Sequence, residues 1–273
     1  MQPETPIQIL FRFTFPMATA LLAACSGDDA SNLPDAGPGA DAPAADAPSS
    51  DGPPVSTAAL RLADVVIASP GASGTGFGDP QRAVNGIKGG GLSGGSVDVY
   101  SLSLLPALNQ SITLGWSNNG RLANGPGADL VIFENGFDTS VGPFMDLIAV
   151  EVSRDGVTWR PLARDYVTAD ETVYVRDRAA WVGFAGKTPV LYDTTANPVN
   201  PFDAALAGGD QLDLETVTGT DAEAAAIRAE GVTQVRLIAA PSLINPDTGA
   251  LFVRDSFANG ADLDGMIGRY VTP

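Results

Sequence analysis

Residues 148–162 read IAVEVSRDGVTWRPL and carry the clearest structural signal of the chain. The first five residues place every second apolar side chain on the same side, as in a strand with one buried and one solvated face. The Asp155-Gly156 pair that follows is typical of a tight hairpin, because glycine readily adopts the positive φ angles of such turns. Trp159 then packs across the pair of strands. The stretch therefore predicts an antiparallel β-hairpin.

Similar strand signals recur through the rest of residues 60–273, separated by turns rich in glycine and proline; the whole chain has 31 glycines and 21 prolines. One helix is expected over residues 221–230, with Asp221 as its N-cap and Gly231 as its stop. The segments with strand patterns are residues 62–68, 97–105, 111–117, 130–133, 147–153, 157–162, 172–175, 232–239 and 266–271. Many short strands with turn-rich connections predict a mainly β domain, an antiparallel β-sandwich or jelly roll with one short helix, over residues 59–273.

The N-terminus carries an export signal. Residues 13–24 are apolar apart from two threonines, too short to span a bilayer, and run into Cys25. Small residues before a cysteine resemble the bacterial lipobox, which implies that residues 1–24 are a signal peptide and that Cys25 is diacylated. Ser26 resembles the pattern for export to the outer membrane or cell surface. The alternatives are a chance cysteine in an ordinary secretory peptide and a buried core cysteine.

Residues 25–58 link this signal to the domain. Of the 33 residues from 26 to 58, 29 are Ala, Asp, Pro, Ser or Gly, and none is aromatic or basic. Such a segment buries too little apolar surface to offset the entropy lost on ordering, so we expect a disordered tether. Fully extended as polyproline II, at about 3.1 Å per residue, it would reach about 100 Å.

The composition excludes several classes of function. The chain has no histidine and one cysteine, which rules out Ser-His-Asp and Cys-His catalysis and the usual zinc sites. Residues 89–95, GGGLSGG, match both the dinucleotide-binding and the nucleophile-elbow patterns, but no helix is expected after them and no histidine can activate Ser93. A net charge of −17 argues against a nucleic-acid partner. Oxygen ligands for Ca²⁺ or Mg²⁺ remain.

Two resemblances cover the folded part. Residues 153–159 and 231–237 resemble strands of galactose-binding-like jelly rolls, including discoidin-type domains. A wider set of motifs is similar to a family of bacterial cell-surface lipoproteins, prominent in spirochaetes, that has no established activity. This resemblance implies fold and location in the cell envelope more than function. The motifs are residues 77–80 (FGDP), 83–86 (AVNG), 98–102 (DVYSL), 124–129 (NGPGAD), 133–135 (FEN), 181–186 (WVGFAG) and 244–249 (INPDTG).

A group of carboxylates and amides near the C-terminus suggests a calcium site. Its members lie within ten residues: Asp255, Asn259, Asp262 and Asp264. An EF-hand is excluded, because the twelfth position counted from Asp262 is Pro273 rather than glutamate. The pairs that can complete a jelly-roll calcium loop are Asp129 with Glu134 and Asp210 with Asp213. The alternative is that these residues are ordinary turn and capping residues.

Three functions remain in view. The leading hypothesis is a non-catalytic module, stabilised by calcium, that binds an extracellular glycan or surface protein, with Trp116 and Trp181 as candidate stacking residues. Both tryptophans can equally belong to the core. The alternatives are a structural or adhesive envelope protein without a small ligand, and a glycoside hydrolase that uses Glu134 and Glu151. Solvated strand positions are the plainer explanation for that glutamate pair.

Overall fold

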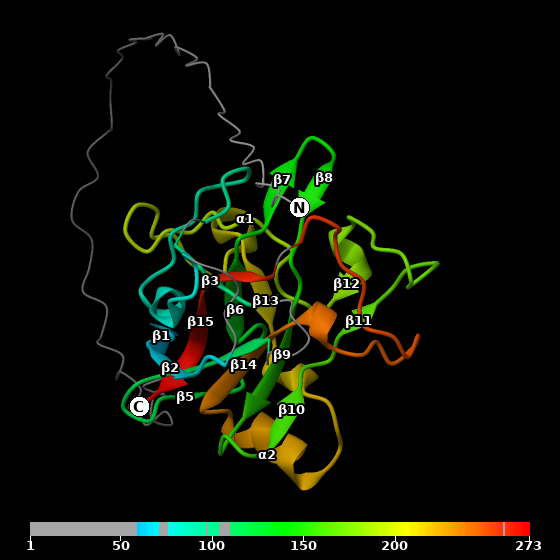
Figure 1. The fold of residues 1–273 in the computed structure, drawn as a ribbon. Coiled ribbons are helices and arrows are strands. Elements are labelled where there is room, and N and C mark those ends of the chain that lie inside the picture. Colours follow the sequence, from blue (N-terminus) through cyan, green and yellow to red (C-terminus); the bar gives the residue numbers. More distant parts are fainter. Residues whose placement is uncertain (1–58, 71–75, 97, 104–109, 259) are drawn as a thin grey trace, which may run out of the picture. The chain divides into compact units, whose positions relative to one another are not determined.

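The computed structural model describes residues 59–70, 76–96, 98–103, 110–258 and 260–273. The expected signal peptide, Cys25, the expected linker up to residue 58 and Asn259 lie outside these residues. The described part of the chain is mainly β, as expected, and its main sheets are antiparallel (Figure 1). Within it, no helix has the length and apolar composition needed to cross a membrane.

The first sheet is organised around one long strand near the C-terminus. This strand pairs with four others in the sheet, and the sixth strand pairs on the far side of β6. The six strands are β1 (Ala59–Leu62), β3 (Tyr100–Ser101), β5 (Arg121–Leu122), β6 (Leu130–Glu134), β13 (Asp210–Leu212) and the long β15 (Asp262–Thr272).

The second sheet has five strands in the order β10-β9-β14-β4-β2. Their bounds are β2 (Val65–Ala68), β4 (Ser111–Gly115), β9 (Ile148–Ser153), β10 (Trp159–Pro161) and β14 (Gln234–Ala239). Two small two-stranded sheets complete the strands: β7 (Phe137–Thr139) with β8 (Gly142–Phe144), and β11 (Asp165–Tyr166) with β12 (Trp181–Val182).

Helical segments are short. The expected helix is α2 (Ala222–Glu230): the Asp221 carboxylate accepts hydrogen bonds from the amides of Glu223 and Ala224, and Gly231 ends the helix with a φ of 76°. The remaining helical segments are α1 (Ala204–Ala207) and the 3-10 turns η1 (Pro80–Val84), η2 (Arg178–Ala180), η3 (Leu214–Thr216) and η4 (Ala240–Ser242).

The hairpin expected at residues 148–162 is confirmed, with a wider turn than expected. Ser153 lies opposite Trp159, so five residues rather than two connect β9 to β10. The Asp155 carboxylate closes this loop by accepting hydrogen bonds from the amides of Val157 and Thr158, both at 2.8 Å. Gly156 takes a φ of 74°, the left-handed conformation that favours glycine there.

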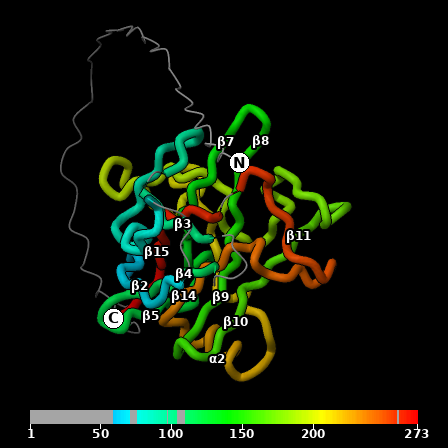
Figure 2. Tube along the Cα trace, in the orientation of Figure 1, coloured from blue at the N-terminus to red at the C-terminus, as the bar shows by residue number. Residues whose placement is uncertain are grey.

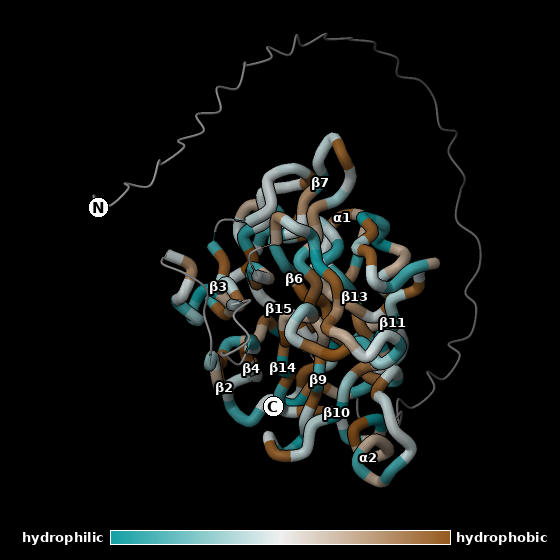
Figure 3. Tube along the Cα trace, turned by 45° about the vertical axis from the view of Figure 1, so that its right-hand side comes forward, coloured by the Kyte–Doolittle hydropathy of each residue, from teal (hydrophilic) through white to brown (hydrophobic). Residues whose placement is uncertain are grey.

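The core lies between the two sheets. Buried side chains of β4, β9 and β14 pack against those of β6 and β15 in one continuous cluster. The opposite face of the first sheet is also covered, because Val131, Phe133 and Ile267 pack against Val190 and Tyr192. All five residues of β6 are therefore buried, which explains its unbroken apolar run LVIF (Figure 3).

Two strand predictions were wrong. Residues 62–68 form not one strand but two in different sheets: the Ala63 amide donates to Met266 of β15 at 2.9 Å, and the Asp64 amide donates to Gly115 of β4 at 3.2 Å. Figure 2 traces this passage from β1 into β2. Residues 172–175 form no strand, because the Tyr166 hydroxyl donates to the Val173 carbonyl and accepts from the Val175 amide.

Candidate functional site

Six carboxylates of the described residues are buried, an unusual number for a charged group. Three of them lie near one another, because the charges of Asp146, which precedes β9, and Asp210, which begins β13, both act on Glu134 at the end of β6. The six are Asp129, Glu134, Asp146, Asp210, Asp255 and Asp264. The acids singled out by the sequence are thus mostly interior groups rather than solvated ones.

Four of these carboxylates tie together segments that lie apart in the sequence. Asp129 accepts from the amides of Gly125 at 2.8 Å and Leu214 at 2.9 Å. Glu134 accepts from the Asp262 amide, and Asp264 from the Lys88 amide, each at 2.9 Å. Asp210 accepts from the Lys187 amide at 2.8 Å. These contacts give the acids a structural role, because each acid accepts a hydrogen bond from a backbone amide that is not paired with a neighbouring strand.

Burial raises the pKa values of several of these groups. It raises the pKa of Asp129 to about 6 and that of Asp264 to about 7. Burial, with the negative charges of Asp262 and Asp255 behind it, raises the pKa of Asp146 to about 8. The pKa of Glu134 lies well above its usual range, first through burial and then through the charge of Asp146. The raised pKa values of Glu134, Asp146 and Asp264 therefore favour the protonated carboxyl near neutral pH, whereas Asp129 lies at the opposite end of β6 from Glu134.

The residues expected to bind calcium are only partly brought together. The Asp262 carboxylate accepts from the Ser101 hydroxyl, next to the contact between its own amide and Glu134. Asp255 instead forms an ion pair with Arg176 at 2.7 Å. Asp213 caps η3 through the Glu215 amide at 2.8 Å, an ordinary capping role. Within the described residues, no three acidic groups are grouped so that they could hold one metal ion.

Glu134 Oε2 and Asp264 Oδ1 are buried carboxylate oxygens that lack a hydrogen-bond partner among the described residues. Glu134 is only 2% exposed, and its Oε2 atom contacts no donor among the described residues. Its other oxygen is used by the Asp262 amide. A buried acceptor without a donor costs about 1–3 kcal/mol, so the Glu134 Oε2 atom destabilises the fold unless it gains a partner.

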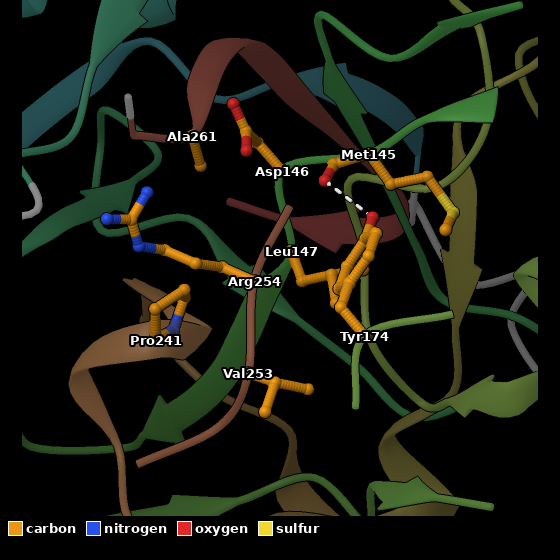
Figure 4. A pocket seen from close by; sticks show the side chains of 8 residues that line it. All are labelled: Met145, Asp146, Leu147, Tyr174, Pro241, Val253, Arg254 and Ala261. Carbon is orange, nitrogen blue, oxygen red and sulfur yellow. Dashed lines mark hydrogen bonds between the residues drawn. The ribbon is translucent and has the colours of Figure 1, made fainter. Parts of the chain in front are cut away.

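A small cavity lies beside Asp146 (Figure 4). Arg254 and Tyr174 also line it, and the Tyr174 hydroxyl donates to the Met145 carbonyl at 3.1 Å. The cavity holds about 10 Å³, room for about one water molecule. It is too small to admit a substrate to the Asp146 carboxylate.

The two glutamates considered for hydrolysis are not brought together. Glu134 belongs to β6 of the first sheet and Glu151 to β9 of the second. Glu151 accepts from Arg236 Nε at 3.0 Å, and the Arg236 guanidinium stacks 4.1 Å from the centre of the Trp159 ring. The structure therefore pairs Glu151 with arginine rather than with a second carboxylate.

Of the two tryptophans considered for stacking on a sugar, only Trp116 lies beside a hollow. Trp181 is completely buried: its ring stacks on Tyr166, with 3.6 Å between centroids, and its Nε1 donates to the Val175 carbonyl at 3.1 Å. It is a core residue, which was the alternative interpretation. Trp116 is 5% exposed, and its Nε1 donates to the Arg61 carbonyl at 3.3 Å.

The hollow beside Trp116 is a groove of about 400 Å³ at one end of the second sheet. We call it the amide groove, because three of its lining side chains are primary amides. Its lining residues are Val65, Ile67, Trp116, Ser117, Asn118, Asn119, Gly120, Thr233 and Gln234. None of them is charged.

A tight turn shapes one wall of the amide groove. Asn118 and Asn119 both take a φ of 58°, and the Gly120 amide donates to the Ser117 carbonyl at 3.2 Å, as in a type I′ turn. The Asp64 carboxylate anchors this turn by accepting from the Ser117 amide at 2.7 Å. No hydrogen bond within the described residues uses the amide groups of the Asn118, Asn119 and Gln234 side chains.

Sequence reasoning missed the amide groove. The Asn-Asn-Gly stretch at residues 118–120 was an available signal for a turn with positive φ, but a turn alone does not reveal a groove. Gln234 joins it only because β14 pairs with β4, which places Gln234 opposite Gly115. No family model, curated protein or solved structure matches this chain.

Proposed function

We propose that this chain is a lipid-anchored surface protein whose residues 59–273 form a non-catalytic module that binds a neutral glycan in the amide groove. The proposal keeps the expected lipid on Cys25, the tether over residues 26–58 and the likeness to galactose-binding-like cell-surface lipoproteins. The observation that carries it is the uncharged, amide-lined groove in a protein with a net charge of −17.

The lining chemistry suits sugar hydroxyls. Each carboxamide offers two donors and one acceptor oxygen, and the hydroxyls of Ser117 and Thr233 add to these groups. Ile67, which is 44% exposed, provides an apolar surface for the C–H face of a sugar ring. The volume of about 400 Å³ falls in the range of ordinary ligand sites, about 300–1,000 Å³. A charged ligand would find no charged partner in this lining.

The binding test is a screen of neutral polysaccharides and oligosaccharides against the full chain, followed by calorimetry on each glycan that binds. Asn118→Gly removes an amide while keeping a residue that tolerates the left-handed φ, and Gln234→Ala removes the second amide. Each lost hydrogen bond, at about 1 kcal/mol, weakens binding about fivefold. Gln81→Ala, an exposed glutamine outside the groove, is the matched control.

The outcomes separate clearly. Binding that weakens in both groove variants and persists in Gln81→Ala supports the amide groove. A glycan bound equally by all four proteins occupies another place, and a screen without any neutral ligand contradicts the proposed binding and favours a purely structural or adhesive role. The hydrolase is not proposed, because Glu134 and Glu151 lie in different sheets.

Anchoring is tested separately. We expect Cys25→Ser to move the protein from the membrane fraction to the soluble fraction, because the lipid has no other thiol to attach to in this chain. Ser26→Ala is the control, since it leaves the acylated residue in place. Membrane association that survives Cys25→Ser contradicts the lipid anchor.

Calcium is part of the same proposal. A cation beside Glu134 would neutralise the carboxylates whose burial raises their pKa values, and would provide a partner for the free Glu134 Oε2 atom. Asp262 is the adjoining carboxylate, through the contact of its amide with Glu134. Addition of a chelator should then lower the melting temperature of the full chain, because removal of a ligand that binds only the folded state destabilises it.

A further inference from the structure

Arg164 stands apart among the arginines that the structure describes. The others each form an ion pair, a hydrogen bond or a contact with an aromatic ring; Arg160, for example, pairs with Asp221 at 2.7 Å. Arg164 forms none of these within the described residues, although acidic residues outnumber basic ones by 32 to 15 in the chain. An arginine that remains unpaired in such an acidic protein is available for a ligand.

The nearby acid is already occupied. Glu151 is the acidic group whose charge acts on Arg164, but its Oε2 atom accepts from Arg236 Nε at 3.0 Å. Burial meanwhile lowers the pKa of Arg164, although a guanidinium stays protonated in proteins. The structure therefore holds a partly desolvated positive charge without a direct counter-ion, and an anion from solution would stabilise it.

Arg164 lines a hollow of about 180 Å³, separate in its lining residues from the amide groove. Four of the other lining residues are apolar: Pro161, Leu162, Pro246 and Phe252. The fifth, Thr218, already donates its hydroxyl to the Pro161 carbonyl at 3.0 Å. Arg164 is thus the one charged residue in the otherwise mostly apolar lining of this hollow.

We propose that this hollow binds a small organic carboxylate with an apolar body. The planar guanidinium fork matches the two oxygens of a carboxylate, and the proline, leucine and phenylalanine walls match a hydrocarbon or aromatic group. Inorganic phosphate fits less well, because apolar walls leave most of its oxygens without donors. The negative net charge repels anions in general, so any binding that occurs depends on this local arrangement.

The experiment titrates the full chain with benzoate, followed by calorimetry and by the Nε–Hε NMR signal of Arg164. Acetate lacks the apolar body and benzamide lacks the charge, so we expect both to bind at least about tenfold more weakly than benzoate. Arg164→Gln should weaken benzoate binding at least about tenfold, and Arg164→Lys, which keeps the charge without the fork, should lie between. Arg160→Gln, which removes a neighbouring arginine that is already paired, should bind as the wild type does.

Several results would overturn the proposal. One is an Arg164 signal that does not move at about 10 mM benzoate, ten times a 1 mM dissociation constant. Another is equal binding of benzoate to the wild type and Arg164→Gln, which would place the ligand elsewhere. Equal binding of acetate and benzoate would remove the role of the apolar walls. None of these results bears on glycan binding in the amide groove.

Discussion

Asp264→Asn tests the electrostatics of the buried carboxylates most directly. Asp264 is completely buried, and burial raises its pKa from 3.8 to about 7. A raised pKa means that the folded state keeps a proton that the unfolded state has lost. The stability from this group is therefore present below pH 4 and is lost as the pH rises through 7. At pH 8 the folded protein carries the full cost of a charged, buried carboxylate.

The magnitude follows from that pKa difference. At about 1.4 kcal/mol per pKa unit, the cost above pH 7 is about 4 kcal/mol. Asparagine removes the charge and can still accept from the Lys88 amide, but its NH₂ group enters a buried position at a cost of about 1–3 kcal/mol. The expected net gain at pH 8 is about 2 kcal/mol, or roughly 4–8 °C in melting temperature for a domain of this size.

The assay is thermal unfolding of the full chain at pH 4 and pH 8, in chelator and in calcium. In chelator, Asp264→Asn should be more stable than the wild type at pH 8, and the gain should disappear at pH 4. Asp247→Asn, an exposed aspartate, should match the wild type throughout. If Asp264 binds calcium, the variant should be less stable than the wild type when calcium is present. An unchanged or lower melting temperature at pH 8 in chelator refutes the burial argument.

Three further variants test the packing and capping, each measured by urea unfolding. Trp181→Ala should destabilise by about 3–5 kcal/mol, because the ring is fully buried against Tyr166; a loss below about 1 kcal/mol would contradict that packing. Asp221→Ala should cost about 1 kcal/mol through loss of the cap on α2, and Asp221→Asn, which can still cap, should retain most of it. Gly231→Ala should cost about 1–3 kcal/mol, because φ is 76° and the new Cβ would lie 2.0 Å from the Leu122 carbonyl oxygen; a neutral effect would show that the chain ends α2 differently.

Much of the fold could be predicted because its signals are local. Alternation of apolar residues identified β4, β9 and β14, an unbroken apolar run identified β6, and the cap-and-stop pair identified α2. The two-residue strands β5, β11 and β12 are too short to show a period, so their pairing depends on neighbours distant in the sequence. The switch of residues 62–68 between sheets has the same cause, since each half follows a different partner strand.

The acidic residues could be picked out from the sequence, but their surroundings could not. In the sequence, nothing distinguishes Asp129, Glu134 and Asp264 from a solvated acid such as Asp247. In the structure, each of the three is buried and accepts a hydrogen bond from a backbone amide in another part of the chain. Burial and mutual charge set their pKa values, and both depend on contacts across many intervening residues. The amino-acid composition still limited the chemistry of these acids to binding a cation through oxygen atoms and to binding protons.

The amino-acid sequence alone excluded histidine catalysis and predicted both a β-sandwich and lipid attachment at Cys25. These inferences need only the composition of the chain and patterns that extend over a few residues. Folding in three dimensions was needed to separate Glu134 from Glu151, to bury Trp181 and to assemble the amide groove from β2, the turn after β4 and the start of β14. It also left Arg164 unpaired by giving Glu151 to Arg236. A side chain's partners are set by strand pairing and packing, which join residues that no local pattern connects.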